Sequence, residues 1–187
     1  LRYKEVLNLN NKNDQPLVVC SLGDASCTEG EVAEAFQMAV LKKLPIIYLV
    51  QDNDWDISAK AEETRAQNIS FFAKGFKGLE TITIDGTDFI ESYNAVGKAL
   101  DATRKRKCPV LIHAKVPLLN HHTSGVRMEW YRDDLEEHIS RDPLPKLKEL
   151  LLKNDFSEAE ISEISKNSMK IVLDDYNKAI KEKDPKL

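Results

Sequence analysis

A chain of 187 residues fits one domain and can bury a sizeable core. Its 27 basic and 31 acidic residues leave a net charge of −4, so its electrostatics give no reason to expect nucleic acid or an anionic membrane as a partner. No apolar run approaches the roughly 20 residues that a membrane-spanning helix needs. The chain starts at Leu1, without a Met and in a polar segment, and we interpret it as a piece of a longer polypeptide whose N-terminal part is missing here.

Strands and helices are predicted to alternate along the chain. Apolar runs and period-two alternation indicate four strands, while a 3.6-residue apolar period and capping residues indicate the helices. The predicted strands are residues 17–22, 45–50, 79–84 and 110–115, and the predicted helices are 31–43, 69–76, 88–106, a helix from 143, and 157–181. This alternation is typical of an α/β fold, here a parallel sheet with helices on both faces. We assign residues 1–142 to the α/β domain and residues 143–187 to its helical C-terminal extension.

The turns after the first two strands carry the most informative polar residues. The first turn is Gly23-Asp24-Ala25-Ser26, and the second contains Asn53, which follows Asp24 by 29 residues. Two parallel strands joined by a helix place both turns at the same edge of the sheet, where open α/β sheets bind ligands. A carboxylate and an amide oxygen would then meet there. Both are oxygen donors of the kind that Mg²⁺ takes when it also holds a diphosphate.

These residues resemble the thiamine-diphosphate motif of the α subunits of 2-oxoacid dehydrogenase E1 enzymes, in which Gly-Asp-Gly is followed further along the chain by Asn. The resemblance runs in order from about Leu17 to about Leu152. The other matching segments are Glu29-Gly30, Glu34-Ala35, Leu44-Pro45, Ile57-Ser58, Asp85-Gly86-Thr87-Asp88, His121-His122, Tyr131-Arg132 and Asp142-Pro143-Leu144. A match of this length is more specific than the short motif, which other thiamine enzymes share.

The resemblance implies that the chain binds thiamine diphosphate and Mg²⁺. It assigns Asp24 as the carboxylate ligand of the metal, Asn53 as a side-chain oxygen ligand, and Trp55 as a ligand through its backbone carbonyl. Taken alone, Asp24 is equally well explained as a turn or capping residue, and Asn53 as an ordinary turn residue. The assignment therefore depends on their spacing and on the wider resemblance.

The turn around Ala25 is expected to bind the diphosphate. Gly23 ends the strand, and the backbone N–H groups of Ala25 and Ser26 would face the anion, with the dipole of the following helix adding to the attraction. The family has glycine at the position of Ala25, so alanine would be strained if the turn needs a positive φ. Asp52, where the family more often has asparagine, adds a negative charge that either strengthens metal binding or repels the diphosphate.

The long polar segment 116–142 contains the adjacent residues His121 and His122. Segments of this length without regular structure are often functional. The resemblance implies that His122 reaches the cofactor diphosphate and the reacting centre and serves as an acid there, with His121 as a supporting neighbour. Thr123 and Ser124 follow, where animal members carry a phosphorylated serine, and the sequence does not decide whether either is modified here.

The remaining histidines and the cysteines are interpreted as structural. His113 lies in an apolar strand, and His138 lies in a polar segment. Three cysteines without a C-x-x-C pair favour reduced thiols over a disulfide framework. Cys27 lies near a helix start, where a thiol pKa can be lowered, but we assign it no role.

By resemblance, the parent enzyme is an E1 component that decarboxylates a 2-oxoacid, pyruvate or a branched-chain analogue, and passes the acyl group to the lipoyl domain of an E2 acyltransferase. The implied partner is a β-type domain or subunit, fused or separate, which in this family holds the cofactor pyrimidine and supplies the activating glutamate. Because the sequence shows no such domain, we expect the 187-residue chain alone to be inactive. The implied location is the bacterial cytoplasm, or the mitochondrial matrix of a eukaryote.

Two alternatives stay open. The cofactor domain of a transketolase-like enzyme shares the Gly-Asp and Asn signals, but it should lack the His121-His122 pair and the helical tail that follows Asp142-Pro143-Leu144. The second alternative is an inactive fragment or interaction module that no longer binds cofactor. Ala25 and Asp52 are the residues that favour this alternative.

Overall fold

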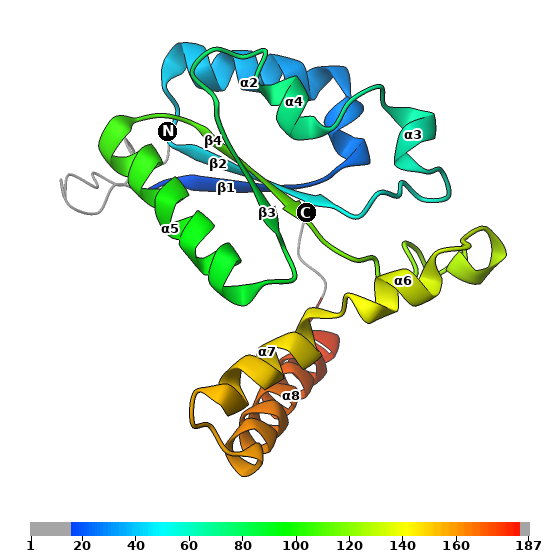
Figure 1. Ribbon diagram of the computed structural model, residues 1–187. Helices are drawn as coiled ribbons and strands as arrows, with labels where there is room; N and C mark the ends of the chain where they lie inside the picture. The colour runs from blue at the N-terminus through cyan, green and yellow to red at the C-terminus, as the bar shows by residue number, and fades with distance from the viewer. Residues whose placement is uncertain (1–15, 184–187) are drawn as a thin grey trace. The chain divides into compact units, whose positions relative to one another are not determined.

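The computed structural model describes residues 16–183 and contains a four-stranded sheet (Figure 1). Its strands are β1 (Val18–Gly23), β2 (Ile46–Asp52), β3 (Glu80–Asp85) and β4 (Val110–Lys115). They pair in the order β1-β2-β4-β3, and every pairing is parallel. The predicted parallel α/β fold is therefore confirmed, with each strand within two residues of its expected bounds.

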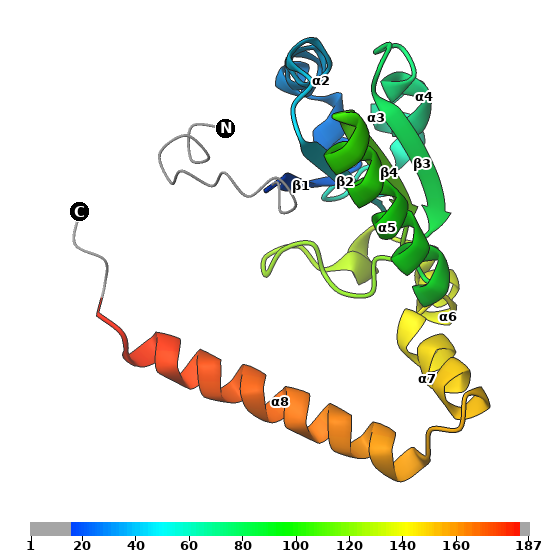
Figure 2. The ribbon, with the colours of Figure 1, turned by 90° about the vertical axis from the view of Figure 1, so that its left-hand side faces the viewer.

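Helices cover both faces of this sheet (Figures 1 and 2). Helices α2 and α4 pack on one face, and α5 packs on the other. In chain order the helical elements are the 3₁₀ helix η1 (Ala25–Thr28), α2 (Gly30–Lys42), α3 (Ala61–Thr64), α4 (Ile69–Ala73), α5 (Phe89–Arg106), the 3₁₀ helix η2 (Met128–Trp130), α6 (Leu135–Ser140), α7 (Pro143–Lys153) and α8 (Glu158–Lys181).

An apolar cluster lies on each side of the sheet. Tyr48 and Val50 of β2 belong to the cluster that contains Phe36 of α2, whereas Ile47 belongs to the cluster that contains Ala99 of α5. This division follows from the alternation of side chains along a strand. Because both faces are covered, the middle of each inner strand is apolar, and polar groups are concentrated where the strands end. The fold thus places the candidate site at the carboxyl edge of the sheet.

Local sequence signals set the ends of several helices. The carboxylate of Asp88 accepts a hydrogen bond from the Glu91 N–H at the start of α5 (2.9 Å), as predicted. Ser157 and Glu160 form the predicted capping box at the start of α8. Lys43 ends α2 in the left-handed conformation, with φ of 50°. These caps fix where α5 and α8 begin and where α2 ends.

The polar segments contain more regular structure than the sequence predicts. The stretch after β2 includes α3, and the segment 116–142 includes η2 and α6. Each of these helices has six residues or fewer. A helix of this length spans less than two turns, so its apolar period cannot be recognised in sequence.

Two compact units divide between Pro143 and Leu144. In the second unit, an ion pair of 2.8 Å joins Lys148 of α7 to Glu158 of α8. Helix α8 exposes the apolar side chains of Ile164, Met169, Ile171, Val172, Leu173, Tyr176 and Ile180. Neither α8 nor any other helix within residues 16–183 is long and apolar enough to cross a membrane.

Candidate functional site

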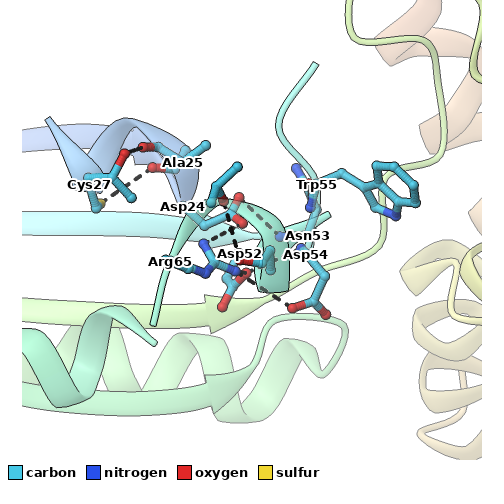
Figure 3. Close-up of polar contacts among 12 residues, drawn as sticks. Asp24, Ala25, Cys27, Asp52, Asn53, Asp54, Trp55 and Arg65 are labelled. Atoms are coloured by element: carbon cyan, nitrogen blue, oxygen red, sulfur yellow. Dashed lines mark hydrogen bonds and ion pairs between the residues drawn. The ribbon is translucent and has the colours of Figure 1, made fainter. Parts of the chain in front are cut away.

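The candidate site lies where the neighbouring strands β1 and β2 end (Figure 3). Asp24 directly follows β1, and Asn53 directly follows β2. The Asp24 side chain is buried, and the backbone N–H of Asn53 points to its Oδ1 atom at 3.5 Å, the outer limit for a hydrogen bond. Parallel pairing therefore brings together the two residues whose spacing first indicated a site.

A buried arginine lies on the Asp24 carboxylate. The guanidinium of Arg65, just after α3, donates from Nη1 to Asp24 Oδ2 (2.6 Å) and from Nη2 to Asp52 Oδ1 (2.8 Å). Its side chain is only 9% exposed, and the two carboxylates are buried as well. Asp54, largely exposed, lies 3.7 Å from the same Nη2 atom. One guanidinium thus bridges two buried carboxylates. Its planar set of N–H donors is better suited to this role than the ammonium group of a lysine.

His113 of the neighbouring strand β4 contacts Asp52. The histidine is fully buried, and its Nε2 atom is 2.6 Å from Asp52 Oδ2. The other oxygen, Oδ1, accepts the Asp54 N–H at 3.2 Å in addition to the Arg65 contact. Both oxygens of Asp52 therefore have polar partners among the described residues.

The two carboxylates have opposite pKa shifts. Burial, followed by the charge of Asp52, raises the pKa of Asp24 to about 6, although Arg65 acts in the other direction. Burial also acts to raise the pKa of Asp52, but the hydrogen bond with His113 and the charge of Arg65 outweigh it and hold that pKa well below its ordinary value. Asp52 is therefore the fully ionised member of the pair. The negative charge of Asp24 is less well compensated.

The indole of Trp55 points away from Asp24 (Figure 3). Its Nε1 atom donates to Asp134 Oδ2 at 2.7 Å, and its ring lies 5.5 Å from the ring of Tyr131, centroid to centroid. The guanidinium carbon of Arg132 is 5.2 Å from the centroid of the indole. Only the backbone of Trp55 is left to face the site, which is compatible with a carbonyl ligand. The side chain instead anchors the turn after β2 to a distant segment.

His138 completes this anchor. Its Nδ1 atom accepts the Leu118 N–H at 2.9 Å, and its Nε2 atom is 3.2 Å from Asp134 Oδ2. Burial, followed by the charge of Arg132, holds the pKa of His138 below its ordinary value, so the neutral ring with its proton on Nε2 is favoured. Leu118 and Asp134 are thereby joined through one imidazole. The loop between them carries the two adjacent histidines.

The two adjacent histidines, His121 and His122, differ in their contacts. His121 accepts the Met128 N–H at its Nδ1 atom (3.2 Å), and the same atom lies 3.8 Å from the carboxylate of Glu129. His122 is exposed, and no hydrogen bond or ion pair in the described part of the chain joins it to Asp24. The role of His122 toward a cofactor stays a prediction, with His121 holding the loop beside it.

The turn after Asp24 differs from the one expected. Ala25 and Ser26 belong to the separate helix η1, and α2 begins only at Gly30, after Glu29. Among the described residues, Ala25 is not one with a positive φ, so the steric cost anticipated for alanine is absent. Ala25 and Ser26 are the first two residues of η1, so they lie further from the start of α2 than expected, and the binding of a diphosphate by their N–H groups stays a prediction.

A cavity of about 270 Å³ adjoins Asp24 and Arg65. It is also lined by Cys27, Thr28, Thr64, Ala66, Gln67, Ile69 and Phe72. The Cys27 thiol donates to the Gly23 carbonyl at 3.4 Å, and burial, with the nearby Asp24 charge, raises its pKa to about 12. The lowered pKa that a helix start can give is therefore not found, and this thiol is protonated at neutral pH.

The donor atoms around Asp24 are of the types that hold a hard divalent cation. Asp24 follows β1, and Asn53 and Trp55 follow β2, so all three residues lie at the same edge of the sheet. Asn53 Oδ1 accepts the Trp55 N–H at 3.0 Å, which orients the amide and leaves a second lone pair on that oxygen. These residues fit Mg²⁺ in kind. The feature that the sequence did not predict is the guanidinium of Arg65 on the same carboxylate.

Residues 6–187 match the protein family described as Dehydrogenase E1 component. The chain belongs to this family. The match confirms the resemblance that the Asp24 and Asn53 motif and the later segments first indicated.

Curated relatives of this E1-family chain are distant. It is 31% identical over 168 residues to the pyruvate dehydrogenase E1 component subunit alpha of Porphyra purpurea, covering 89% of this chain and 48% of the relative. The same-named subunit of Rickettsia bellii (strain RML369-C) is 28% identical over 154 residues, 81% of this chain and 47% of the relative. The 3-methyl-2-oxobutanoate dehydrogenase subunit alpha of Mycobacterium tuberculosis (strain ATCC 25618 / H37Rv) is 30% identical over 142 residues, 74% of this chain and 38% of the relative. The chain thus spans about half the length of the first two relatives and less of the third.

Among solved structures, a transketolase from Campylobacter jejuni subsp. jejuni NCTC 11168 is similar, with a TM-score of 0.51 and 28% identity. The similarity covers 60% of this chain and 17% of that one. It supports the fold of the parallel sheet and its helices.

In this E1-family chain, sequence analysis missed Arg65 and treated His113 as merely structural. Arg65 lies in a polar, charged segment, and nothing in its spacing distinguishes it from a solvated residue. His113 did carry a signal, because a lone histidine in an apolar strand has to find a buried polar partner. That partner is Asp52, beside the candidate metal ligands.

Proposed function

We propose that this chain forms the diphosphate-binding part of an E1 component, α-subunit type, of a 2-oxoacid dehydrogenase. The observation that supports this most is the meeting of Asp24 and Asn53 at neighbouring strand ends, in a chain of the E1 dehydrogenase family. The reaction would be the oxidative decarboxylation of a 2-oxoacid. Pyruvate and a branched-chain 2-oxoacid are both candidates, because relatives named for each match at similar identity.

In this proposal the chain anchors and orients the cofactor. Thiamine diphosphate, when bound, stabilises the carbanion that decarboxylation produces. Asp24, Asn53 and the backbone carbonyl of Trp55 would hold Mg²⁺, and the backbone from Gly23 to Ser26 would face the diphosphate. The Trp55 indole is fixed by Asp134, so the turn that carries two of the three ligands is held in place from outside the site.

His122 would act from the loop between Leu118 and Asp134. The imidazole of His138 contacts both ends of this loop, at Leu118 and Asp134, and His121 accepts a hydrogen bond from the Met128 N–H within it. A histidine positioned on such a loop is a common general acid in enzymes. We assign His122 a contact with the cofactor diphosphate and an acid role at the reacting centre.

The proposed partners follow from the relatives and from the size of the chain. The relatives are named as alpha subunits, and the chain spans about half of the first listed ones. A β-type domain or subunit would cover the part of the cofactor that this chain does not reach. The lipoyl domain of an E2 acyltransferase would accept the acyl group. Without the β-type part, we expect the 187 residues to show no turnover.

The test is a decarboxylation assay of the complete protein together with its β-type partner. Pyruvate and 3-methyl-2-oxobutanoate are supplied in turn, with Mg²⁺ and thiamine diphosphate, and carbon dioxide release is measured with an artificial electron acceptor. The proposal predicts turnover of at least one substrate that disappears when thiamine diphosphate is left out. Turnover of neither substrate, with both chains folded, would overturn it.

A further inference from the structure

The Asp24 carboxylate already has a cation within bonding distance, supplied by the chain itself. Arg65 Nη1 lies 2.6 Å from Asp24 Oδ2, and only 9% of the arginine side chain is exposed. A buried carboxylate without a counter-charge is costly, so the guanidinium stabilises the fold when no other cation is present.

The guanidinium also has a second anchor, which keeps it beside Asp24. Arg65 Nη2 lies 2.8 Å from Asp52 Oδ1, and His113 holds the opposite oxygen of Asp52 at 2.6 Å. Asp52 thus stays paired with His113 even if Arg65 moves. Asp24 differs, since apart from Arg65 its side chain contacts the carboxyl group of Asp52 and accepts the Asn53 N–H at the long distance of 3.5 Å, so Arg65 is the one cation on it among the described residues.

A divalent cation and a guanidinium on one carboxylate repel each other. Their separation would be a few ångströms in a site shielded from water, where the repulsion between like charges is much stronger than in bulk water. The backbone at Arg65 is extended, at the end of the four-residue helix α3, and its side chain borders the cavity of about 270 Å³. The guanidinium therefore has open space next to it.

We propose that Arg65 is the resident counter-ion of Asp24, and that a divalent cation binds this carboxylate only by displacing Arg65 from it. This inference rests on the metal-ligand role of Asp24 in the proposed function. Arg65 then weakens the binding of a metal ion that arrives alone. Metal binding is favoured when an anionic ligand enters together with the metal ion. The anion then provides a negative partner for the guanidinium, which has lost its contact with Asp24.

The test uses Mn²⁺ alone as the probe, without thiamine diphosphate, on the complete protein. Electron paramagnetic resonance measures the free Mn²⁺ concentration and hence the dissociation constant. We expect Arg65→Gln to bind Mn²⁺ more tightly than the wild type by on the order of tenfold, the size of a typical coupling within one charged network. Arg106→Gln is the matched control, since Arg106 pairs with Glu80 at the surface. It should bind Mn²⁺ like the wild type.

A second measurement needs no variant, so it tests the displacement of Arg65 even if Arg65→Gln does not fold. Labelling of arginines in the wild type by phenylglyoxal is followed by mass spectrometry, with and without saturating Mn²⁺. Displacement predicts faster labelling of Arg65 with Mn²⁺ and unchanged labelling of Arg106. Equal Mn²⁺ affinity of the wild type and Arg65→Gln, no binding by either, or labelling of Arg65 that Mn²⁺ does not accelerate would overturn the inference. None of these results depends on decarboxylation, so the proposed function is tested separately.

Discussion

Replacing Trp55 by phenylalanine should loosen the loop that carries His122. The substitution keeps an aromatic ring against Tyr131 but removes the hydrogen bond of 2.7 Å from Nε1 to Asp134. A hydrogen bond to a charged group contributes about 1.5–3 kcal/mol. The Asp134 side chain is 23% exposed, so water can replace part of the lost interaction, and the lower end of that range applies.

A loss of about 1.5 kcal/mol corresponds to roughly tenfold faster amide exchange wherever this contact limits local opening. Hydrogen exchange followed by mass spectrometry should show the increase in peptides from residues 53–56 and 116–138, and no change in the strands. Trp130→Phe is the matched control, because Trp130 is 71% exposed. If the two variants exchange at the same rate in these peptides, the indole does not anchor the loop and the reasoning fails.

Three further outcomes are expected. His122→Ala should lower kcat of the complete enzyme by about 10²-fold, as loss of a positioned acid does, while the neighbouring Thr123→Ala stays near the wild type in the same steady-state assay. Folding lowers the pKa of His138 below 6.5, so on acidification the imidazole becomes protonated in the unfolded chain before it does in the folded one. The stability that the neutral ring contributes is therefore present above about pH 6.5 and is lost as the pH falls below it. His138→Gln should flatten this loss, measured as the change of the thermal unfolding temperature with pH. Cys27, with a pKa of about 12, should react with iodoacetamide at neutral pH far more slowly than a free thiol, and labelling as fast as that of a small thiol would contradict the buried position.

The fold could be read from the sequence because its signals are local and repeated. The four apolar strands, the Asp88 cap and the capping box at Ser157 all lie where the pattern indicated. The meeting of Asp24 with Asn53 followed from parallel pairing alone, since that pairing aligns the strand ends. These features need no knowledge of side-chain contacts.

The electrostatics of the site could not be read in this way. Arg65 is 41 residues from Asp24 in sequence, and His113 is 61 residues from Asp52. Such pairs depend on how a short helix and a strand from different parts of the chain pack together, and no periodic pattern records that packing. The unstrained backbone at Ala25 is a similar case, because the helix η1 is too short to leave a recognisable period.

The most direct test of the proposed cofactor site is a calorimetric titration of thiamine diphosphate, with Mg²⁺ present, into the complete protein and its β-type partner. Three forms are compared: the wild type, Asp24→Ala, and Asp101→Ala, whose carboxylate pairs with Lys105 at the surface. Removing one ligand of a metal that bridges to the diphosphate should weaken binding by on the order of a hundredfold or more. We predict that loss for Asp24→Ala, with an unchanged circular dichroism spectrum, and wild-type affinity for Asp101→Ala. An unchanged affinity of Asp24→Ala for thiamine diphosphate would contradict the account.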